Sequence, residues 1–181
     1  MKPTMKPMSY TKSHTLALAL AAATLSMVGG CGGGGGDPPS VATMSASNAS
    51  YGRTMTISVN GSALTKGDFK VIVEGPCGEV SRVSGGTDLL QQFTCRVSGL
   101  GLMIPRVRTA DGLELASLRV DVPAPQVSMT VGQGLRSGSF VVELDPVAAR
   151  VTVDNYLAYV NAGFYRNTLF HRVVANFVAQ A

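Results

Sequence analysis

Few residues of this 181-residue chain have types and spacings that could support chemistry. The acidic residues between positions 41 and 122 stand singly, so they do not form the carboxylate pairs that acid–base catalysis often uses. They are Asp68, Glu74, Glu79, Asp88, Asp111, Glu114 and Asp121, and each is expected to be a solvated surface charge. Histidine is rare, and the sequence has neither a CxxC redox motif nor a cluster of metal-ligand types. The sequence therefore indicates no metal and no cofactor.

The remaining candidates gather near the end of the chain. Phe170, His171 and Arg172 are consecutive, and Phe177 and Gln180 follow within a few residues. Taken alone, Arg172 reads as a surface arginine on a strand. Its interpretation therefore depends on the elements and motifs around it.

The elements expected to position these side chains begin after two closely spaced prolines, Pro123 and Pro125, which mark a domain boundary. The runs 127–131 and 139–144 predict a hairpin of two strands. Asp145-Pro146 is a helix-start signal, and the apolar spacing over 151–161 predicts an amphipathic helix. Gly163 should end this helix, and the runs 168–174 and 176–181 predict further strands.

This C-terminal region resembles cyclophilin-type peptidyl-prolyl isomerases. The resemblance rests on a series of motifs that occur in the family's order and spacing. They are Gly138-Ser-Phe-Val-Val-Glu-Leu, Thr152-Val-Asp-Asn-Tyr156, Tyr159-Val-Asn-Ala-Gly-Phe-Tyr165, Thr168-Leu-Phe-His-Arg-Val173 and Phe177-Val-Ala-Gln180. They cover residues 127–181, which correspond to no more than the N-terminal part of such a domain.

The resemblance implies roles for individual residues. Arg172 would be the catalytic arginine, and Phe177 would form the wall of a proline pocket. Val178 stands where the family usually has Met, and Gln180 would hydrogen-bond the substrate backbone. Phe170 and His171 match the motif as substrate-lining or structural positions. The implied substrates are proline-containing polypeptides.

Two departures from the family pattern stand out. Ala149-Arg150 replaces the usual Ala-Pro before the helix, which removes a rigid helix start. The chain also stops at Ala181, directly after Gln180, whereas the family continues with further strands and a second helix. We therefore expect an incomplete cyclophilin-like β-barrel with one helix, belonging to a fragment of a longer protein. The 181-residue form should be inactive alone, and the complete domain should be active.

The middle region, residues 41–122, is expected to form a small antiparallel β-sandwich that loosely resembles bacterial immunoglobulin-like modules. Turn residues separate its short β-rich runs, as such a sandwich requires. The runs are 54–59, 69–74, 79–84, 92–98, 103–109 and 113–122. Cys77 and Cys95 are expected to form a disulfide, because an exported chain meets an oxidising compartment. The bridge would close a loop of about 18 residues and contribute ~3 kcal/mol.

Residues 1–30 have the three parts of a secretory signal, with a basic start, an apolar run over 15–28 and small residues at the exit. The run is about 14 residues long, shorter than a membrane-spanning helix needs. Val28-Gly-Gly-Cys31 resembles a bacterial lipobox, which implies lipidation of Cys31; the alternative is an ordinary signal cut that leaves Cys31 free. Residues 31–40 would be a Gly/Pro-rich tether.

These features predict an exported protein on the periplasmic side, anchored by its lipid to the outer rather than the inner membrane. The net charge of +4 arises mostly from lysines in the first thirty residues, so no basic surface for nucleic acid is expected. The main hypothesis is a lipid-anchored isomerase that assists the folding of exported proteins. The rival is a non-enzymatic lipoprotein whose β-sandwich binds a partner and whose isomerase segment is a remnant. Continuation of the reading frame past Ala181 would favour the first.

Overall fold

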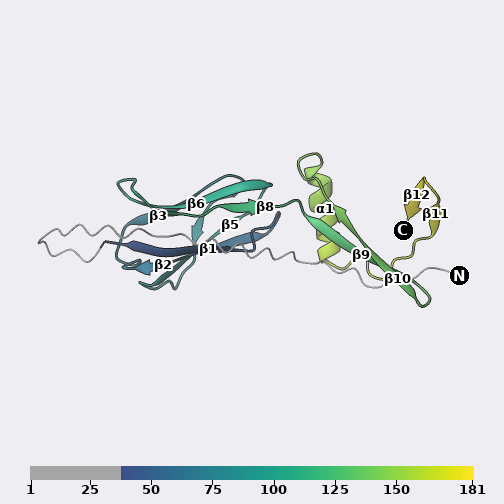
Figure 1. Cartoon of the computed structure of the whole chain (residues 1–181), viewed down its shortest axis with the longest axis horizontal. Helices are drawn as coiled ribbons and strands as arrows, with labels where there is room; N and C mark the ends of the chain where they lie inside the picture. Colours follow the sequence, from purple (N-terminus) through teal and green to yellow (C-terminus); the bar gives the residue numbers. More distant parts are fainter. Residues whose placement is uncertain (1–37) are drawn as a thin grey trace, which may run out of the picture. The chain divides into compact units, whose positions relative to one another are not determined.

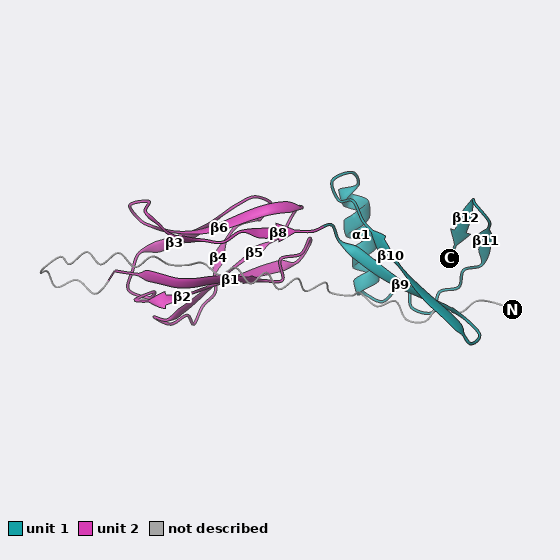
Figure 2. Ribbon diagram, viewed as in Figure 1, with its two compact units in different colours: residues 1–15, 124–181 teal, residues 16–123 magenta. Residues whose placement is uncertain are grey.

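The computed structural model describes residues 38–181, which form two compact units, 38–123 and 124–181 (Figure 2). The division falls between Pro123 and Ala124, within the proline-rich segment. The predicted signal peptide, Cys31 and the tether up to residue 37 lie outside the described residues.

The first unit consists of two antiparallel sheets, which Figure 1 shows as two layers. One sheet has the strand order β1-β2-β5-β4; in the other, β3 and β7 flank β6, and β8 also pairs with β6. The strands are β1 (Ser40–Ser47), β2 (Thr54–Ser62), β3 (Phe69–Glu74), β4 (Ser81–Arg82), β5 (Leu90–Arg96), β6 (Gly101–Thr109), β7 (Glu114–Ser117) and β8 (Val120–Val122). The predicted antiparallel sandwich is therefore confirmed.

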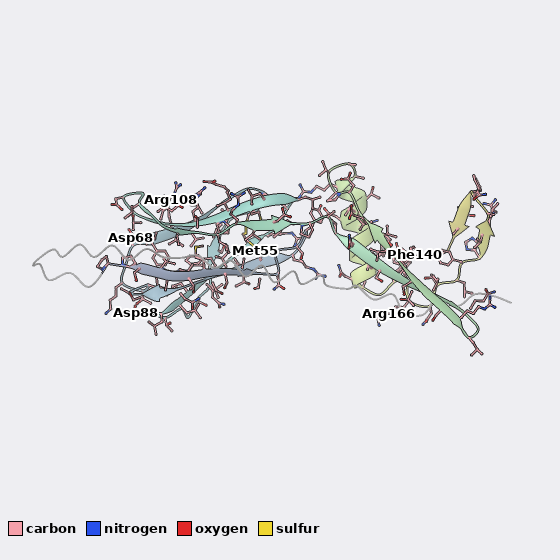
Figure 3. All side chains as sticks on the ribbon, in the orientation of Figure 1. Met55, Asp68, Asp88, Arg108, Phe140 and Arg166 are labelled. Carbon is pink, nitrogen blue, oxygen red and sulfur yellow. A yellow bond between two sulfur atoms is a disulfide. The ribbon has the colours of Figure 1, made fainter. Side chains whose placement is uncertain are left out.

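The core of the sandwich lies between the two sheets. In β2 the side chains of Met55, Ile57 and Val59 are fully buried, because alternate residues of a strand point to one face. Figure 3 shows Met55 between the layers. Residues from both sheets complete one contiguous cluster: Leu64, Phe69, Val71, Phe93, Cys95, Val97, Met103, Val107 and Val122. Each fully buried aliphatic or aromatic side chain of this kind stabilises the fold by ~1.5–3 kcal/mol.

The predicted disulfide between Cys77 and Cys95 is present, with the two Cα atoms 5.9 Å apart. Cys95 is buried in β5, and Cys77 follows β3 and pairs with Val97 through an isolated β-bridge. The bond ties the connection between β3 and β4 to β5.

An arginine covers two core rings on this unit. The Arg82 guanidinium lies 5.2 Å from the centre of the Phe69 ring and 5.6 Å from that of Phe93. Arg82 also donates hydrogen bonds to the Gln91 side-chain oxygen and to the Leu64 carbonyl. The cation is therefore fixed by both cation–π and hydrogen-bond contacts.

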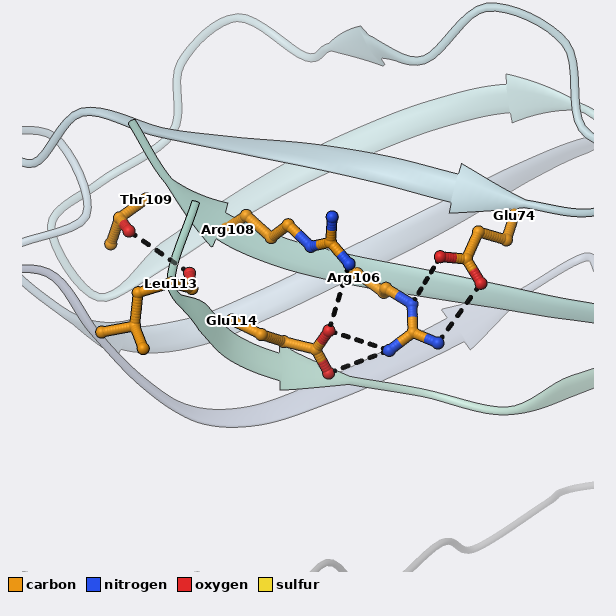
Figure 4. Close-up of polar contacts among 6 residues, drawn as sticks. All are labelled: Glu74, Arg106, Arg108, Thr109, Leu113 and Glu114. Atoms are coloured by element: carbon orange, nitrogen blue, oxygen red, sulfur yellow. Dashed lines mark hydrogen bonds and ion pairs between the residues drawn. The ribbon is translucent and has the colours of Figure 1, made fainter. Parts of the chain in front are cut away.

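A charged network links neighbouring strands of the second sheet (Figure 4). Arg106 of β6 donates to Glu74 of β3 and to both carboxylate oxygens of Glu114 of β7. Arg108 lies 3.7 Å from Glu114. Because Arg106 donates these bonds, the pKa of the Glu114 carboxyl is held below its ordinary value.

The structure differs from the predicted strand runs at several points, and the run 79–84 is reduced to the two residues of β4. β1 precedes the first predicted run and was not identified. The predicted run 113–122 is divided into β7 and β8 opposite Pro105 of β6, because proline has no backbone N–H to donate to the partner strand. The Leu118 amide donates to the Pro105 carbonyl between the two short strands.

The second unit begins with the hairpin of β9 (Gln126–Gln133) and β10 (Arg136–Glu143), followed by the helix α1 (Arg150–Asn161). Within the described residues, β10 pairs only with β9. Phe140 and Val141 of β10 are 45% and 60% exposed. β11 (Arg172–Val174) and β12 (Val178–Gln180) form a separate two-stranded sheet, so the described residues contain no closed barrel. The predicted strands over 168–174 and 176–181 are reduced to three residues each.

The helix begins later than the Asp145-Pro146 signal indicated. The Asp145 carboxylate accepts hydrogen bonds from the amides of Val147 and Ala148, so it caps the turn before the helix. Ala149 is the N-cap of α1 and makes no side-chain cap bond. None of the helices within residues 38–181 is long and apolar enough to cross a membrane.

Candidate functional site

The predicted site residues lie on and beside the β11–β12 hairpin. The two strands pair antiparallel, with Arg172 opposite Gln180 and Val174 opposite Val178. Directly paired residues point to the same face of a sheet. The register therefore places Arg172, Val178 and Gln180 on one face, away from Val173 and Ala179.

Three of the predicted residues are in contact. The Arg172 guanidinium donates a 2.9 Å hydrogen bond from Nη1 to the Gln180 side-chain oxygen. The same guanidinium lies 5.8 Å from the centre of the Phe177 ring, within the range of a cation–π contact. Phe177 itself is 75% exposed, so most of its ring surface is open to a ligand.

The other predicted residues take no part in these side-chain contacts. The His171 backbone amide donates to the Gln180 carbonyl and so extends the hairpin. The side chains of Phe170 and His171 have no hydrogen bond or ring contact with Arg172 within residues 38–181. Val178 is half-buried opposite Val174. The assigned roles of Phe170, His171 and Val178 remain predictions.

The chain reaches this hairpin through a well-defined helix end. The Gly163 amide donates to Val160 and the Phe164 amide to Tyr159, with Gly163 at a φ of 72°. This is the Schellman pattern, in which the glycine adopts the left-handed conformation. The Tyr159 and Phe164 rings pack with their centres 4.9 Å apart across it. The predicted end of the helix at Gly163 is therefore confirmed.

An aromatic cluster follows from this packing. Tyr165 contacts Tyr156, Tyr159 and Phe164, with ring centres between 5.2 and 6.3 Å apart. The Tyr156 hydroxyl is buried without a hydrogen-bond partner among the described residues, and this burial raises the pKa of the Tyr156 phenol. The Gly-Phe-Tyr motif thus has a structural role in ordering the segment that leads toward Arg172.

The chemistry available to the hairpin is electrostatic. A guanidinium stays charged at all ordinary pH values and offers a planar set of donors. Gln180 occupies one donor of Arg172, and the exposed Phe177 ring provides an apolar surface beside it. Within the described part of the chain, no three His, Cys, Asp or Glu residues are grouped to hold a metal ion. The arrangement suits a small apolar ring next to a group that can accept a hydrogen bond.

Comparison with known proteins places this hairpin in a family. Residues 126–181 match the cyclophilin type peptidyl-prolyl cis-trans isomerase/CLD family. The peptidyl-prolyl cis-trans isomerase cyp18 of Streptomyces antibioticus is 45% identical over 51 residues, which are 28% of this chain and 31% of that relative. Peptidyl-prolyl cis-trans isomerase A of Dickeya dadantii is 46% identical over 44 residues, 24% of this chain and 23% of the relative.

A third relative, peptidyl-prolyl cis-trans isomerase-like 1 of Gibberella zeae, is 42% identical over 43 residues, 24% of this chain and 26% of the relative. No solved structure shows a significant match to the chain. The C-terminal part of the chain is therefore a cyclophilin-type isomerase segment. The chain spans a third or less of the length of the curated relatives it matches.

Proposed function

We propose that this protein catalyses cis–trans isomerisation of X–Pro peptide bonds, with Arg172 as the catalytic residue. The observation that carries the proposal is the contact of Arg172 with both Gln180 and Phe177, in a segment related to cyclophilin-type isomerases. The substrates would be proline-containing polypeptides.

The physical basis is the loss of amide resonance during rotation. Rotation about the peptide C–N bond has a barrier of about 18–20 kcal/mol, because the planar ground state is stabilised by that resonance. In the twisted transition state the prolyl nitrogen becomes pyramidal and its lone pair can accept a hydrogen bond. A guanidinium donor placed beside the nitrogen therefore stabilises the transition state more than the ground state. No covalent intermediate is required.

The neighbouring side chains would hold the substrate for this step. The Phe177 ring would take the pyrrolidine ring by apolar contact, and Gln180 would bind the peptide backbone so that one end stays fixed while the other rotates. The hydrogen bond from Arg172 to Gln180 orients the guanidinium before the substrate arrives. Such preorganisation avoids reorganisation during the reaction.

The test is an isomerisation assay on an Ala-Pro peptide, using the chain in the complete reading frame that encodes it. Arg172→Ala should lower kcat by about 10²–10³, the range expected for removing a donor that acts in the transition state. Arg136→Ala, an exposed arginine of the same unit, is the matched control and should keep its turnover. Unchanged kcat in Arg172→Ala would refute the assigned role.

We further propose that the chain is exported and held on a membrane by a lipid on Cys31. The apolar run 15–28 and the Gly30-Cys31 pair support this, and buried acyl chains supply the membrane affinity. Metabolic labelling with palmitate should mark the protein, and Cys31→Ser should abolish the label. Separation of inner from outer membranes would then test the predicted outer-membrane location.

We also propose that the sandwich is an immunoglobulin-like module. In chain order, the first, second, fifth and fourth strands form one sheet, and the third, sixth and seventh form the other. Seven-stranded immunoglobulin domains have this arrangement. The sandwich has its own core and disulfide, which supports its folding as a separate unit; partner binding by this unit is the second candidate function. A protein that keeps its partner after deletion of residues 124–181 would support that function.

A further inference from the structure

The turn that joins β11 and β12 contains one residue in an unusual backbone conformation. Asn176 has a φ of 57°, in the left-handed region. The Phe177 amide donates to the Val174 carbonyl, which closes a four-residue turn over Ala175 and Asn176. Asn176 is therefore the third residue of this turn, the position at which some tight turns require a positive φ.

Side-chain chemistry explains why asparagine can hold this position. Most residues with a Cβ avoid the left-handed region, while glycine enters it freely and asparagine tolerates it. β-Branched residues are the least compatible with it. The Asn176 side chain is exposed and makes no hydrogen bond within residues 38–181, so its contribution comes through the backbone.

This backbone angle determines where the next residue lies. Phe177 follows Asn176 directly, and its ring lies 5.8 Å from the Arg172 guanidinium. A different φ at Asn176 would break the hydrogen bond from Phe177 to Val174 and redirect the ring. The strand register holding Arg172 opposite Gln180 is set by other pairs, so Arg172 and Gln180 could stay together while Phe177 moved.

We propose that Asn176 is a positioning residue for substrate affinity: its left-handed backbone holds the Phe177 ring beside Arg172 and so builds the apolar wall of the site. The proposal rests on the proposed isomerase function. It predicts that Asn176 acts on substrate binding through Phe177, whereas Arg172 acts on the chemical step.

The first test compares Asn176→Val with Asn176→Gly. If valine lowers the population of the binding-competent turn about tenfold, the apparent Kd for an Ala-Pro peptide should rise about tenfold, because affinity falls with the competent fraction. In the complete reading frame, KM should rise by the same factor while kcat changes less than twofold. Asn176→Gly should retain the affinity of the parent, because glycine adopts the same φ without strain.

Asn167 provides a matched control in the same unit. It also has a positive φ, 62°, but lies outside the hairpin. Asn167→Val imposes a similar backbone penalty and should leave the peptide Kd within twofold of the parent. A loss of affinity equal to that of Asn176→Val would show a general effect of destabilisation and would overturn the proposal.

A second readout does not depend on catalysis. In the 181-residue chain, nuclear Overhauser contacts between the Phe177 ring and the Arg172 side chain should be present in the parent and in Asn176→Gly. They should be lost in Asn176→Val, while contacts between Arg172 and Gln180 persist. Retention of the Phe177 contacts in the valine variant would overturn the proposal.

The double variant Asn176→Val/Phe177→Ala separates the two mechanisms further. If Asn176 acts through Phe177, adding the valine to Phe177→Ala should weaken binding by less than twofold, because the effects are not additive. Full additivity would contradict the proposal. If the parent in its complete reading frame neither binds nor isomerises the peptide, the proposed function fails, and the loss or retention of the Phe177 contacts still decides whether Asn176 positions the ring.

Discussion

The sandwich and the C-terminal unit are both rich in strands, but they bury apolar side chains to different extents. The sandwich has a contiguous core with residues from both sheets, including fully buried Met55, Ile57 and Met103. In residues 124–181 the buried hydrophobic side chains are Val127, Val153 and Val160. Long-range packing therefore holds the sandwich, whereas the predicted site hairpin is shaped mainly by its own register and turn.

The two units also use the same pair of residue types differently. Arg82 covers Phe69 and Phe93, which are 8% and 5% exposed, and its Nε and Nη2 atoms donate to protein acceptors. Arg172 lies beside Phe177, which is 75% exposed. The buried rings make the first arginine–phenylalanine pair part of the core, whereas the exposed ring of the second pair leaves the surface to which we assign substrate binding.

The largest expected effect is on the sandwich core. Ile57→Ala should lower the free energy of unfolding of the sandwich by about 3–4 kcal/mol, because it removes a fully buried side chain and leaves a cavity. Amide hydrogen exchange of β2 and β5 in increasing urea measures this loss. Val173→Ala, which truncates a side chain that is 68% exposed, is the control and should change stability by less than about 0.5 kcal/mol. Equal losses in both variants would contradict the contrast between the units.

A smaller effect should distinguish the two arginines. Arg82→Ala should lower the stability of the sandwich by about 1–2 kcal/mol, through loss of its cation–π and hydrogen-bond contacts, and leave peptide turnover unchanged. Arg172→Ala should do the reverse, with lower turnover and nearly unchanged sandwich stability. Denaturation and isomerisation assays on the same two proteins give the comparison. If fully folded Arg82→Ala showed lower turnover, Arg82 would contribute to catalysis as well, and the contrast between the two arginines would fail.

The smallest effect concerns pH. Arg106 lowers the pKa of Glu114 in the folded state, so the unfolded chain binds a proton at Glu114 more readily than the folded one. This contribution to stability is present above the unfolded pKa of about 4.3 and is lost as the pH falls through the lower folded value. Because the group is exposed, the change should be slight. The sandwich stability of Arg106→Gln, measured between pH 5 and pH 3, should fall less than that of the parent; an identical profile would exclude the network as the cause.

The alternation of apolar and polar residues predicted the strands of the sandwich well. A strand that buries one face has apolar residues at every second position. The run 69–74 coincides with β3, and the buried positions of β2 are those of the alternation Met55, Ile57 and Val59. β1 escaped prediction because its partly buried residues Val41, Met44 and Ala46 are not evenly spaced. The register shift between Val41 and Thr43 in its pairing with β2 accounts for this irregularity.

The motifs selected the residues of the candidate site, but the sequence did not predict their geometry. The motif series selected Arg172, Phe177 and Gln180, and the structure brings these three together. Hydrophobic periodicity carries no information on the backbone φ angle of Asn176, to which we assign the placement of the Phe177 ring. The signal that could have found it is the turn preference of asparagine, placed between two short apolar runs.

Within residues 38–181, β10 pairs with β9 alone, and this has a consequence for handling the protein. Among the residues that the structure describes, no strand pairs with the other side of β10, next to the exposed Phe140 and Val141. An unpaired edge strand of this kind can pair with a strand of another molecule and form an intermolecular sheet. Concentrated solutions of the protein should therefore aggregate through this edge before the sandwich unfolds. Val141→Lys should slow the aggregation, because a charged side chain on an edge strand opposes such pairing.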